Sequence, residues 1–588
     1  MLGPIFYREA SVAPKRPKTF VARSVYVLSL FTLLCTGYLV LDGSRSLMTS
    51  GDSARFGGWM FTLLAPLQLL VLSSVAAVGA AASVAQEKDR RTLLLLLLTR
   101  LSGFEIVVGK LGATLLAPLT LLLGALPLFL VMPLLGGVSP LQVFGVFAVT
   151  GVTILLAGSV GTVVGLWREK TFQAIAMTVL ALLTYLGIGE VIVSQWKEMP
   201  ASFQLSISPV RALSAAASPM ASLSEEIFSA LGCFLLVTSL LSVAILAIGV
   251  WRVRIWNPSR ELRVKPTEDD EKLDAEDKQL SWRAREPKAV WNNPILWREV
   301  RTWAYGRKIV VIRVAFSLLF CLTAAVLQAQ IMNGVAYEAG GRIGRALPSA
   351  TLPFAGLGVI SLILVNALAV NSVTNERDGL ALDLLLVTDL SPREFVFGKL
   401  LGVVYVGKEM ILLPLLLLAY LAIQQVISYE NMTYAILGAA ILFGFVIMLG
   451  IHCGLNYVSG RTAILNSIGT VFFLCVGIAI CMTIMVSFRG AFQLQLAPFL
   501  VMILGGGAAL FASLGWRNPS SAIFFASFGL PLVTFYAITQ FLLQTDHLYV
   551  FVALLSGYVF TTAAMMIPAL SEFDVSLERG RGAVGDEN

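Results

Sequence analysis

The stretch of sequence that decides the fold occurs twice. Residues 83–111 read SVAQEKDRRTLLLLLLTRLSGFEIVVGKL, and residues 372–400 read SVTNERDGLALDLLLVTDLSPREFVFGKL. Aligned without a gap, the two copies are identical at 16 of 29 positions, and all matches lie 289 residues apart. Polar positions such as Glu87 and Glu376 match as well, so a shared richness in leucine does not explain the similarity. The chain therefore contains an internal duplication.

Two weaker similarities extend the duplication to a whole unit. GPIFYREA at residues 3–10 resembles NPILWREV at residues 293–300. A GxxxG pattern at residues 161–165 returns at residues 450–454, again 289 residues later. GxxxG is typical of close helix packing in membranes, and its repeated position gives it weight here.

Long apolar runs surround both copies. Hydrophobic residues make up 57% of the chain and charged residues 13%, whereas soluble domains have about 45–50% and about 25%. This composition excludes an ordinary soluble enzyme, a disordered protein and a fibrous one. A membrane-spanning helix needs about 20 apolar residues, so we expect an all-α polytopic membrane protein with about 14 transmembrane helices. The runs lie near residues 25–41, 59–85, 106–133, 139–166, 172–194, 228–250, 309–328, 352–374, 396–424, 433–458, 464–486, 497–515, 521–543 and 548–570.

Lysine and arginine gather in alternate loops, which places those loops and both termini in the cytoplasm. We expect a first unit of about six spans at 1–256, a charged cytoplasmic linker at 257–291 and a second unit of about eight spans at 292–588. Because six is even, both units have the same orientation. The repeat is then parallel, with a pseudo-twofold axis along the membrane normal. The last two spans, from about residue 521, have no expected counterpart in the first unit.

The remaining features of the composition argue against a catalytic site, a metal site or a bound cofactor in this chain. The net charge of +7 fits the positive-inside pattern, so we expect no nucleic-acid partner. The six cysteines lie in apolar runs without a CxxC pattern, and only His452 and His547 are present. We therefore expect no metal site, no bound cofactor and no catalytic residue. Residues 402–409 resemble a phosphate-binding loop, but Glu409 stands where Ser or Thr is needed.

The duplicated segment follows one plan in both copies. Charges lead into leucines, the chain turns at Leu-Ser, and Gly-Lys leads into the next span. The leucine run is too short to cross a bilayer, so it predicts a short amphipathic helix at the cytoplasmic interface. Ser391-Pro392 followed by Glu394 predicts a serine-capped helix start. Two interpretations stay open: an anchor at the lipid headgroups, or a docking helix that takes force from a cytoplasmic partner.

This plan resembles the loop between spans two and three of type-2 ATP-binding-cassette (ABC) export permeases. The resemblance covers about six spans in each half. The chain departs from the family's single six-span permease because it fuses two permease units and carries two extra spans. The N-terminal stretch with Tyr7-Arg8-Glu9, and its counterpart Trp297-Arg298-Glu299, resemble the connecting helix of that family.

The resemblance implies a multi-pass permease subunit of the cell (inner or plasma) membrane, which is not itself an enzyme. Its coupling helices, near 87–103 and 376–394, would dock on separate cytoplasmic ABC ATPase subunits, two copies in all, that bind ATP-Mg and power export. The docking residues that it implies are Glu87, Asp89, Arg91, Thr99, Glu105, Glu376, Asp378, Thr388 and Glu394.

Two other functions stay open. An ion-driven secondary transporter with parallel repeats would use buried carboxylates, and Glu409, next to Lys408, is the main candidate. We expect this intramembrane pair of charges either to form interhelical ion pairs or to line a pathway. A non-transporting membrane scaffold driven by an ATPase would keep the same docking loops.

Overall fold

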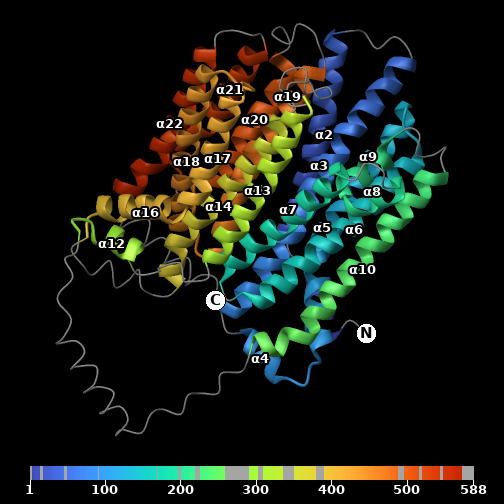
Figure 1. The fold of residues 1–588 in the computed structure, drawn as a ribbon, viewed down its shortest axis with the longest axis horizontal. Coiled ribbons are helices and arrows are strands. Elements are labelled where there is room, and N and C mark those ends of the chain that lie inside the picture. Colours follow the sequence, from blue (N-terminus) through green and yellow to red (C-terminus); the bar gives the residue numbers. More distant parts are fainter. Residues whose placement is uncertain are drawn as a thin grey trace.

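Helices make up most of the chain in its computed structural model (Figure 1), and the described residues contain no strand. Within a bilayer the backbone must satisfy its own hydrogen bonds, so long apolar runs form helices. The structure describes residues 3–12, 17–44, 50–89, 92–168, 170–195, 200–218, 225–257, 291–301, 309–334, 350–378, 390–487, 496–515, 519–542 and 547–571.

The first unit ends with helix α10, and residues 258–290, which hold nearly all of the expected linker, lie outside the described residues. The helices of the first unit are α1 (Gly3–Val12), α2 (Pro17–Ser44), α3 (Ser50–Asp89), α4 (Thr92–Leu98), α5 (Gly103–Leu135), α6 (Pro140–Trp167), α7 (Thr171–Gln195), α8 (Ala201–Ile207), α9 (Pro209–Ala217) and α10 (Glu225–Trp256). The helices of the second unit are α12 (Pro294–Arg301), α13 (Ile309–Met332), α14 (Thr351–Asp378), α16 (Pro392–Val406), α17 (Lys408–Ile423), α18 (Tyr429–Asn456), α19 (Gly460–Ser487), α20 (Leu496–Leu514), α21 (Ser521–Leu542) and α22 (His547–Ser571).

Twelve of the described helices are long and apolar enough to cross a membrane, and α16 with α17 makes a thirteenth span if the bent pair counts as one. The fourteenth expected span is α20. Its apolar stretch Phe499–Leu514 is about 24 Å long at 1.5 Å per residue, shorter than the bilayer core of about 30 Å. The chain is thus an all-α polytopic membrane protein, as expected, with one short helix among the expected spans.

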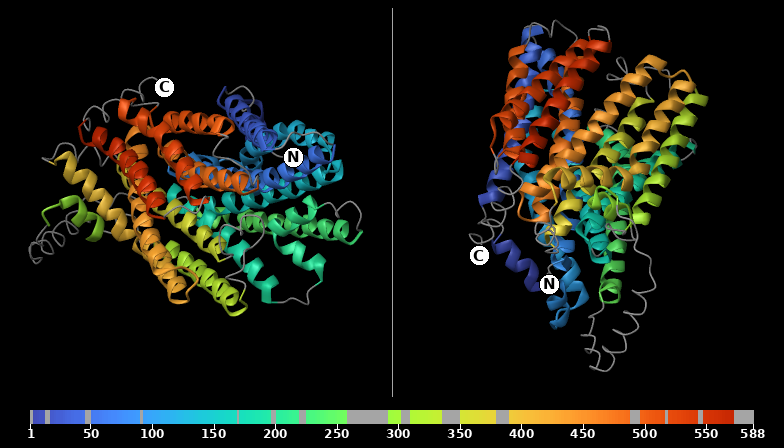
Figure 2. Two further views of the ribbon diagram at one scale, coloured as in Figure 1. Left: turned by 90° about the horizontal axis from the view of Figure 1, so that it is seen from above. Right: turned by 90° about the vertical axis from the view of Figure 1, so that its left-hand side faces the viewer.

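The two units lie side by side, with blue to green helices on one side and yellow to red helices on the other (Figures 1 and 2). In each unit the second span packs on the fourth, α3 on α6 and α14 on α18. The GxxxG positions lie at these crossings. A Cβ added at Gly161 would lie 2.5 Å from the Ala77 carbonyl oxygen, and one at Gly450 would lie 2.6 Å from the Ala369 Cβ. Glycine permits this approach in both units.

The spatial counterpart of α10 in the second unit is α22. Helix α10 packs on α6 and α5, and α22 packs on the equivalent helices α18 and α16. Helices α20 and α21 are therefore the insertion, at the place in the chain where the first unit has the short α8 and α9. The expectation that the two spans from about residue 521 lack a counterpart is wrong by one helix. Chain order does not distinguish α20 from α22, because both are apolar.

Helix α20 joins the two units. Phe499 and Ile503 belong to the hydrophobic core of the first unit, and α20 packs on α2. Its other end is held in the second unit, where the Leu514 carbonyl oxygen lies 2.9 Å from the His452 Nε2. This contact satisfies the buried histidine. On the other side of the molecule, α13 packs directly on α7, so the two sides of the interface between the units are built differently.

The third spans of the two units also differ. In the first unit, α5 continues over 33 residues, whereas α16 and α17 meet at an angle of 59° around Gly407. In α17, Pro414 cannot donate to the Met410 carbonyl four residues earlier. The Ser361 hydroxyl of α14 donates to that carbonyl instead. The apolar run near 396–424 folds as two helices that meet at Gly407, and the Ser361 contact joins α14 to the second of them.

Candidate functional site

The candidate site is the loop module, which occurs in two copies: residues 83–111 and residues 372–400. In the first copy the structure describes all residues except 90–91, and in the second copy all except 379–389. Four predicted docking residues are affected. Arg91 and Thr388 lie outside the described residues, and the side chains of Asp89 and Asp378 are also outside the description.

A buried lysine near the start of the third span pairs with a glutamate near the end of the second span in both copies. Lys110 forms an ion pair with Glu87, and the Lys399 Nζ lies 2.5 Å from the Glu376 Oε1. The lysine side chains are 5% and 0% exposed. A buried ammonium group requires a partner. Each pair therefore joins the two ends of one loop. Its charges are bound to each other within the chain and do not extend toward a partner.

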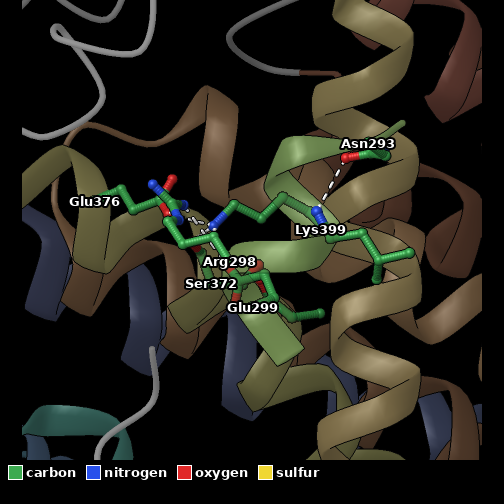
Figure 3. Close-up of polar contacts among 8 residues, drawn as sticks. Asn293, Arg298, Glu299, Ser372, Glu376 and Lys399 are labelled. Atoms are coloured by element: carbon green, nitrogen blue, oxygen red, sulfur yellow. Dashed lines mark hydrogen bonds and ion pairs between the residues drawn. The ribbon is translucent and has the colours of Figure 1, made fainter. Parts of the chain in front are cut away.

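The second copy adds a further glutamate from α12 (Figure 3). The Lys399 Nζ lies 2.6 Å from the Glu299 Oε1 and donates to the Ser372 carbonyl at 2.8 Å. Arg298, the residue before Glu299, forms an ion pair with Glu376. Five groups from α12, α14 and α16 thus form one cluster, so α12 cannot move without disturbing the end of α14.

A short amphipathic helix packs on the third span of each unit, where the two connecting helices are expected. Helix α1 packs on α5, and α12 packs on α16. A Cβ added at Gly112 would lie 2.8 Å from the Phe6 ring, and one at Gly398 would lie 2.8 Å from the Ile295 Cβ. Glycine in the third span therefore makes room for the short helix in both units.

A basic side chain from each copy holds the end of the fourth span. The Lys88 Nζ donates to the carbonyls of Leu166 and Arg168 at 2.6 and 2.8 Å. Arg377, 289 residues later, donates to the Gly454 carbonyl at 2.9 Å. The last carbonyls of a helix lack partners within it, and a cation there also suits the helix dipole. Movement of the loop module is thereby linked to α6 and α18.

The third span of each unit begins with a capping box. The Ser102 hydroxyl accepts from the Glu105 backbone N–H at 3.2 Å, and Glu105 accepts from the Ser102 backbone N–H at 2.9 Å. Ser391 and Glu394 repeat both contacts. This confirms the predicted serine cap. It also shows that both glutamates complete the start of a helix.

The expected short helix of the first copy is α4. Leu93 is buried and Leu97 packs beside it, in a cluster with side chains of α3, α5, α6 and α10. Leu95 and Leu98 face outward and are 64% and 68% exposed. Thr99, which follows α4, is also exposed. Figure 1 shows α4 at the lower end of the molecule, below the main bundle. This end therefore presents two leucines to a partner or to lipid.

Each copy of the loop module also contacts the other unit. The Asn375 Oδ1 accepts from Lys170 at 3.3 Å, and the Gln86 Oε1 accepts from Arg461 at 3.4 Å. Gln86 and Asn375 are equivalent positions, 289 residues apart. The two contacts are therefore reciprocal. They place the second-span ends of both copies at the same end of the molecule, as a parallel repeat requires.

The intramembrane charges Lys408 and Glu409 begin α17, immediately after the bend. The Glu409 Oε2 lies 3.3 Å from the Nε of Arg313 on α13, and Arg313 also donates to the Val406 carbonyl at 2.7 Å. The Lys408 Nζ lies 5.2 Å from the ring centre of Tyr405. The two charges are therefore not a pair with each other. Glu409 takes part in an interhelical ion pair that braces the bend.

The sequence prediction missed five residues that make these contacts: Lys88, Arg377, Gln86, Asn375 and Arg313. A signal for four of them was present, because the 289-residue offset keeps a base at 88 and 377 and an amide at 86 and 375. Arg313 stands 290 residues after Arg23, the offset that also relates the two short amphipathic helices.

Among the described residues, no group of three or more His, Cys, Asp or Glu side chains could hold a metal ion. No protein-family model matches this chain, and no curated protein matches it.

Proposed function

We propose that this chain is the membrane-spanning subunit of an ABC exporter in the plasma membrane, powered by separate ATPase subunits. The observation that supports this proposal is the construction of the loop module. A lipid anchor needs only an apolar face. Here the described part of each copy is tied to the second, third and fourth spans of its own unit and to the other unit. Such ties suit a part that transmits force.

The exposed face of α4 is the proposed docking surface of the first copy. The four glutamates named as docking residues are engaged within the chain, in ion pairs or capping boxes. Leu95 and Leu98, by contrast, are exposed on a helix beyond the main bundle. Burial of two leucines against a partner stabilises a complex by about 1.5–3 kcal/mol per side chain. Docking thus relies on these leucines, while the glutamates hold the module rigid.

Closure of the two ATPase subunits on ATP would then move both loop modules. Since Lys88 and Arg377 hold the ends of α6 and α18, each module carries its fourth span with it. At this end of the molecule each loop copy accepts a long hydrogen bond from the opposite unit, at 3.3 and 3.4 Å, and such bonds can exchange partners. The units would shift against each other at this end and alternate between inward-open and outward-open states.

A double variant tests this docking surface. Leu95→Asp with Leu98→Asp should remove one of the two ATPase copies that co-purify from native cells, because two carboxylates would be buried against the partner at the first module. Leu95→Met with Leu98→Met is the matched control and should retain the ATPase. Full ATPase binding by the aspartate variant, with normal membrane insertion, would contradict the proposal.

One observation favours the ion-driven transporter as a second candidate. The bend between α16 and α17, with Arg313 and Glu409 beside it, is the kind of broken span on which such transporters build binding sites. If this function is correct, Glu409→Gln should abolish uptake driven by an ion gradient in vesicles without ATP. Uptake that requires ATP and survives this substitution would exclude it.

A further inference from the structure

A groove between α2 and α5 holds Arg23, for which the described part of the chain provides no acidic partner. The groove has a volume of about 640 Å³, within the range of about 300–1,000 Å³ typical of ligand sites. Apart from Arg23 and Ser24, its lining residues are apolar. Among them, Leu28 and Phe31 are 62% and 50% exposed. The groove is therefore open and apolar, runs along the flank of a membrane-spanning helix, and has a cation toward the start of α2.

The counterpart of this cation in the second unit has an acidic partner. Arg313, 290 residues after Arg23, is neutralised by Glu409 and also donates to the Val406 carbonyl. The position equivalent to Glu409 in the first unit, 289 residues earlier, is Thr120, which has no charge. Among the described residues, the contact of the Arg23 guanidinium is the Phe20 ring, at 5.5 Å.

The surroundings hold Arg23 at the mouth of the groove. It lies four residues into the apolar stretch Thr19–Val40, about 6 Å along the helix. A guanidinium at this depth extends toward the headgroup region, where it can be neutralised. A Cβ added at Gly124 would lie 3.3 Å from the Arg23 Cγ. The glycine therefore leaves room for the arginine stem to lie along α5.

We propose that this groove binds an anionic phospholipid of the cytoplasmic leaflet. The lipid phosphate would accept hydrogen bonds from the Arg23 guanidinium, whose planar fork matches two phosphate oxygens. One acyl chain would lie along Leu28 and Phe31 of α2 and Val131 of α5. The lipid would thus supply to the first unit the negative charge that Glu409 supplies to the second. This inference does not depend on the proposed transport function.

Native mass spectrometry of the full-length purified chain tests the proposal. The probes are phosphatidylglycerol, phosphatidylcholine with the same acyl chains, and glycerol 3-phosphate as a headgroup without chains. The wild-type chain should retain one phosphatidylglycerol about tenfold more tightly than phosphatidylcholine and should not retain glycerol 3-phosphate. Arg23→Gln should remove this preference and leave retention of phosphatidylcholine unchanged.

Arg252→Gln is the matched control, because Arg252 likewise stacks on an aromatic ring of its own helix, that of Trp251 at 4.4 Å, but lies outside the groove. It should keep the wild-type preference. A bulky side chain in Leu28→Trp should fill the groove and weaken retention of phosphatidylglycerol while the melting temperature is preserved. A preference for phosphatidylglycerol that survives Arg23→Gln, an equal loss in Arg252→Gln, or retention of glycerol 3-phosphate alone would overturn the proposal.

Discussion

At the scale of single residues, Lys399 shows what a repeated charge does in this protein. Its side chain is fully buried and touches Glu299, Glu376 and the Ser372 carbonyl. Its counterpart Lys110 forms an ion pair with Glu87, whose side chain is 30% exposed. The same sequence position therefore lies in a drier environment in the second unit, where both carboxylates that hold Lys399 are nearly buried.

Lys399→Met should lower the free energy of unfolding by about 3–5 kcal/mol, because it removes the fully buried cation and leaves only the partly exposed Arg298 to face Glu299 and Glu376. Lys110→Met is the control. It should have a clearly smaller effect, since Glu87 can turn toward water. Thermal unfolding of both purified variants in detergent measures the difference. Equal melting temperatures for the two variants would refute the special role of the second cluster.

The location of the site in the chain was predictable from the sequence, but its contacts were not. Glu87 and Glu376 stand out because they recur at a fixed offset, and recurrence shows a shared requirement without naming the partner. Their partners, Lys110 and Lys399, lie 23 residues further along, at the far end of the loop. Only the folded loop brings the two ends together. The sequence therefore predicted that Glu87 and Glu376 face outward to a partner, whereas both point inward to a lysine.

At the scale of elements, the helix crossings follow from glycine, and the bend at Gly407 divides the third span of the second unit. The GxxxG positions were predictable because close packing needs glycine at a fixed spacing. The bend at Gly407 was not, because the apolar run near 396–424 reads as one continuous helix. Pro414 lies inside α17, after the bend, and leaves the Met410 carbonyl without its helical donor. Here the donor is Ser361 on α14, which lies 49 residues from that carbonyl in the chain.

Gly450→Ala should destabilise the crossing of α14 and α18 by about 1–3 kcal/mol, because the added methyl group would overlap the Ala369 Cβ. Gly469→Ala is the matched control: Gly469 lies in α19 and a Cβ there meets nothing within 4 Å. That variant should keep its stability or gain slightly from better helix propensity. Chemical denaturation in mixed micelles separates the two cases, and an equal effect of both would count against close packing at this crossing.

Ser361→Ala should lower stability by about 1–3 kcal/mol, because the Met410 carbonyl loses its donor inside the bundle. Ser527→Ala provides the comparison: Ser527 is equally buried, but its hydroxyl donates to the Ile523 carbonyl of its own helix. Its removal should have little effect. Melting temperatures that fall by the same amount would show that Ser361 does not brace the bend.

At the scale of the whole molecule, duplication explains the architecture and one insertion explains its asymmetry. The parallel repeat was predictable from the even number of spans and the constant offset of 289 residues. The insertion of α20 and α21 was predicted one helix too late, because the composition of an apolar helix does not show which helices it packs against. As a result α20 closes one side of the interface between the units, while α7 and α13 meet directly on the other.

The contacts between the loop modules and the opposite units should matter for motion more than for stability. Gln86→Ala with Asn375→Ala removes both reciprocal hydrogen bonds, each at 3.3 Å or more. We expect the melting temperature of the variant to change little. The rate of ATP hydrolysis by the assembled complex should become equal to that of the ATPase subunits without the membrane subunit. A large fall in melting temperature would instead assign these amides a structural role.

The central claim is that one chain supplies two docking modules for ATPase subunits. The most direct test is the intact mass of the complex purified gently from native cells, with identification of every subunit. We predict one copy of this chain with two ATPase copies, and loss of one ATPase copy when Leu95 and Leu98 are both changed to aspartate. A folded chain that purifies alone, without any ATPase, would contradict the account.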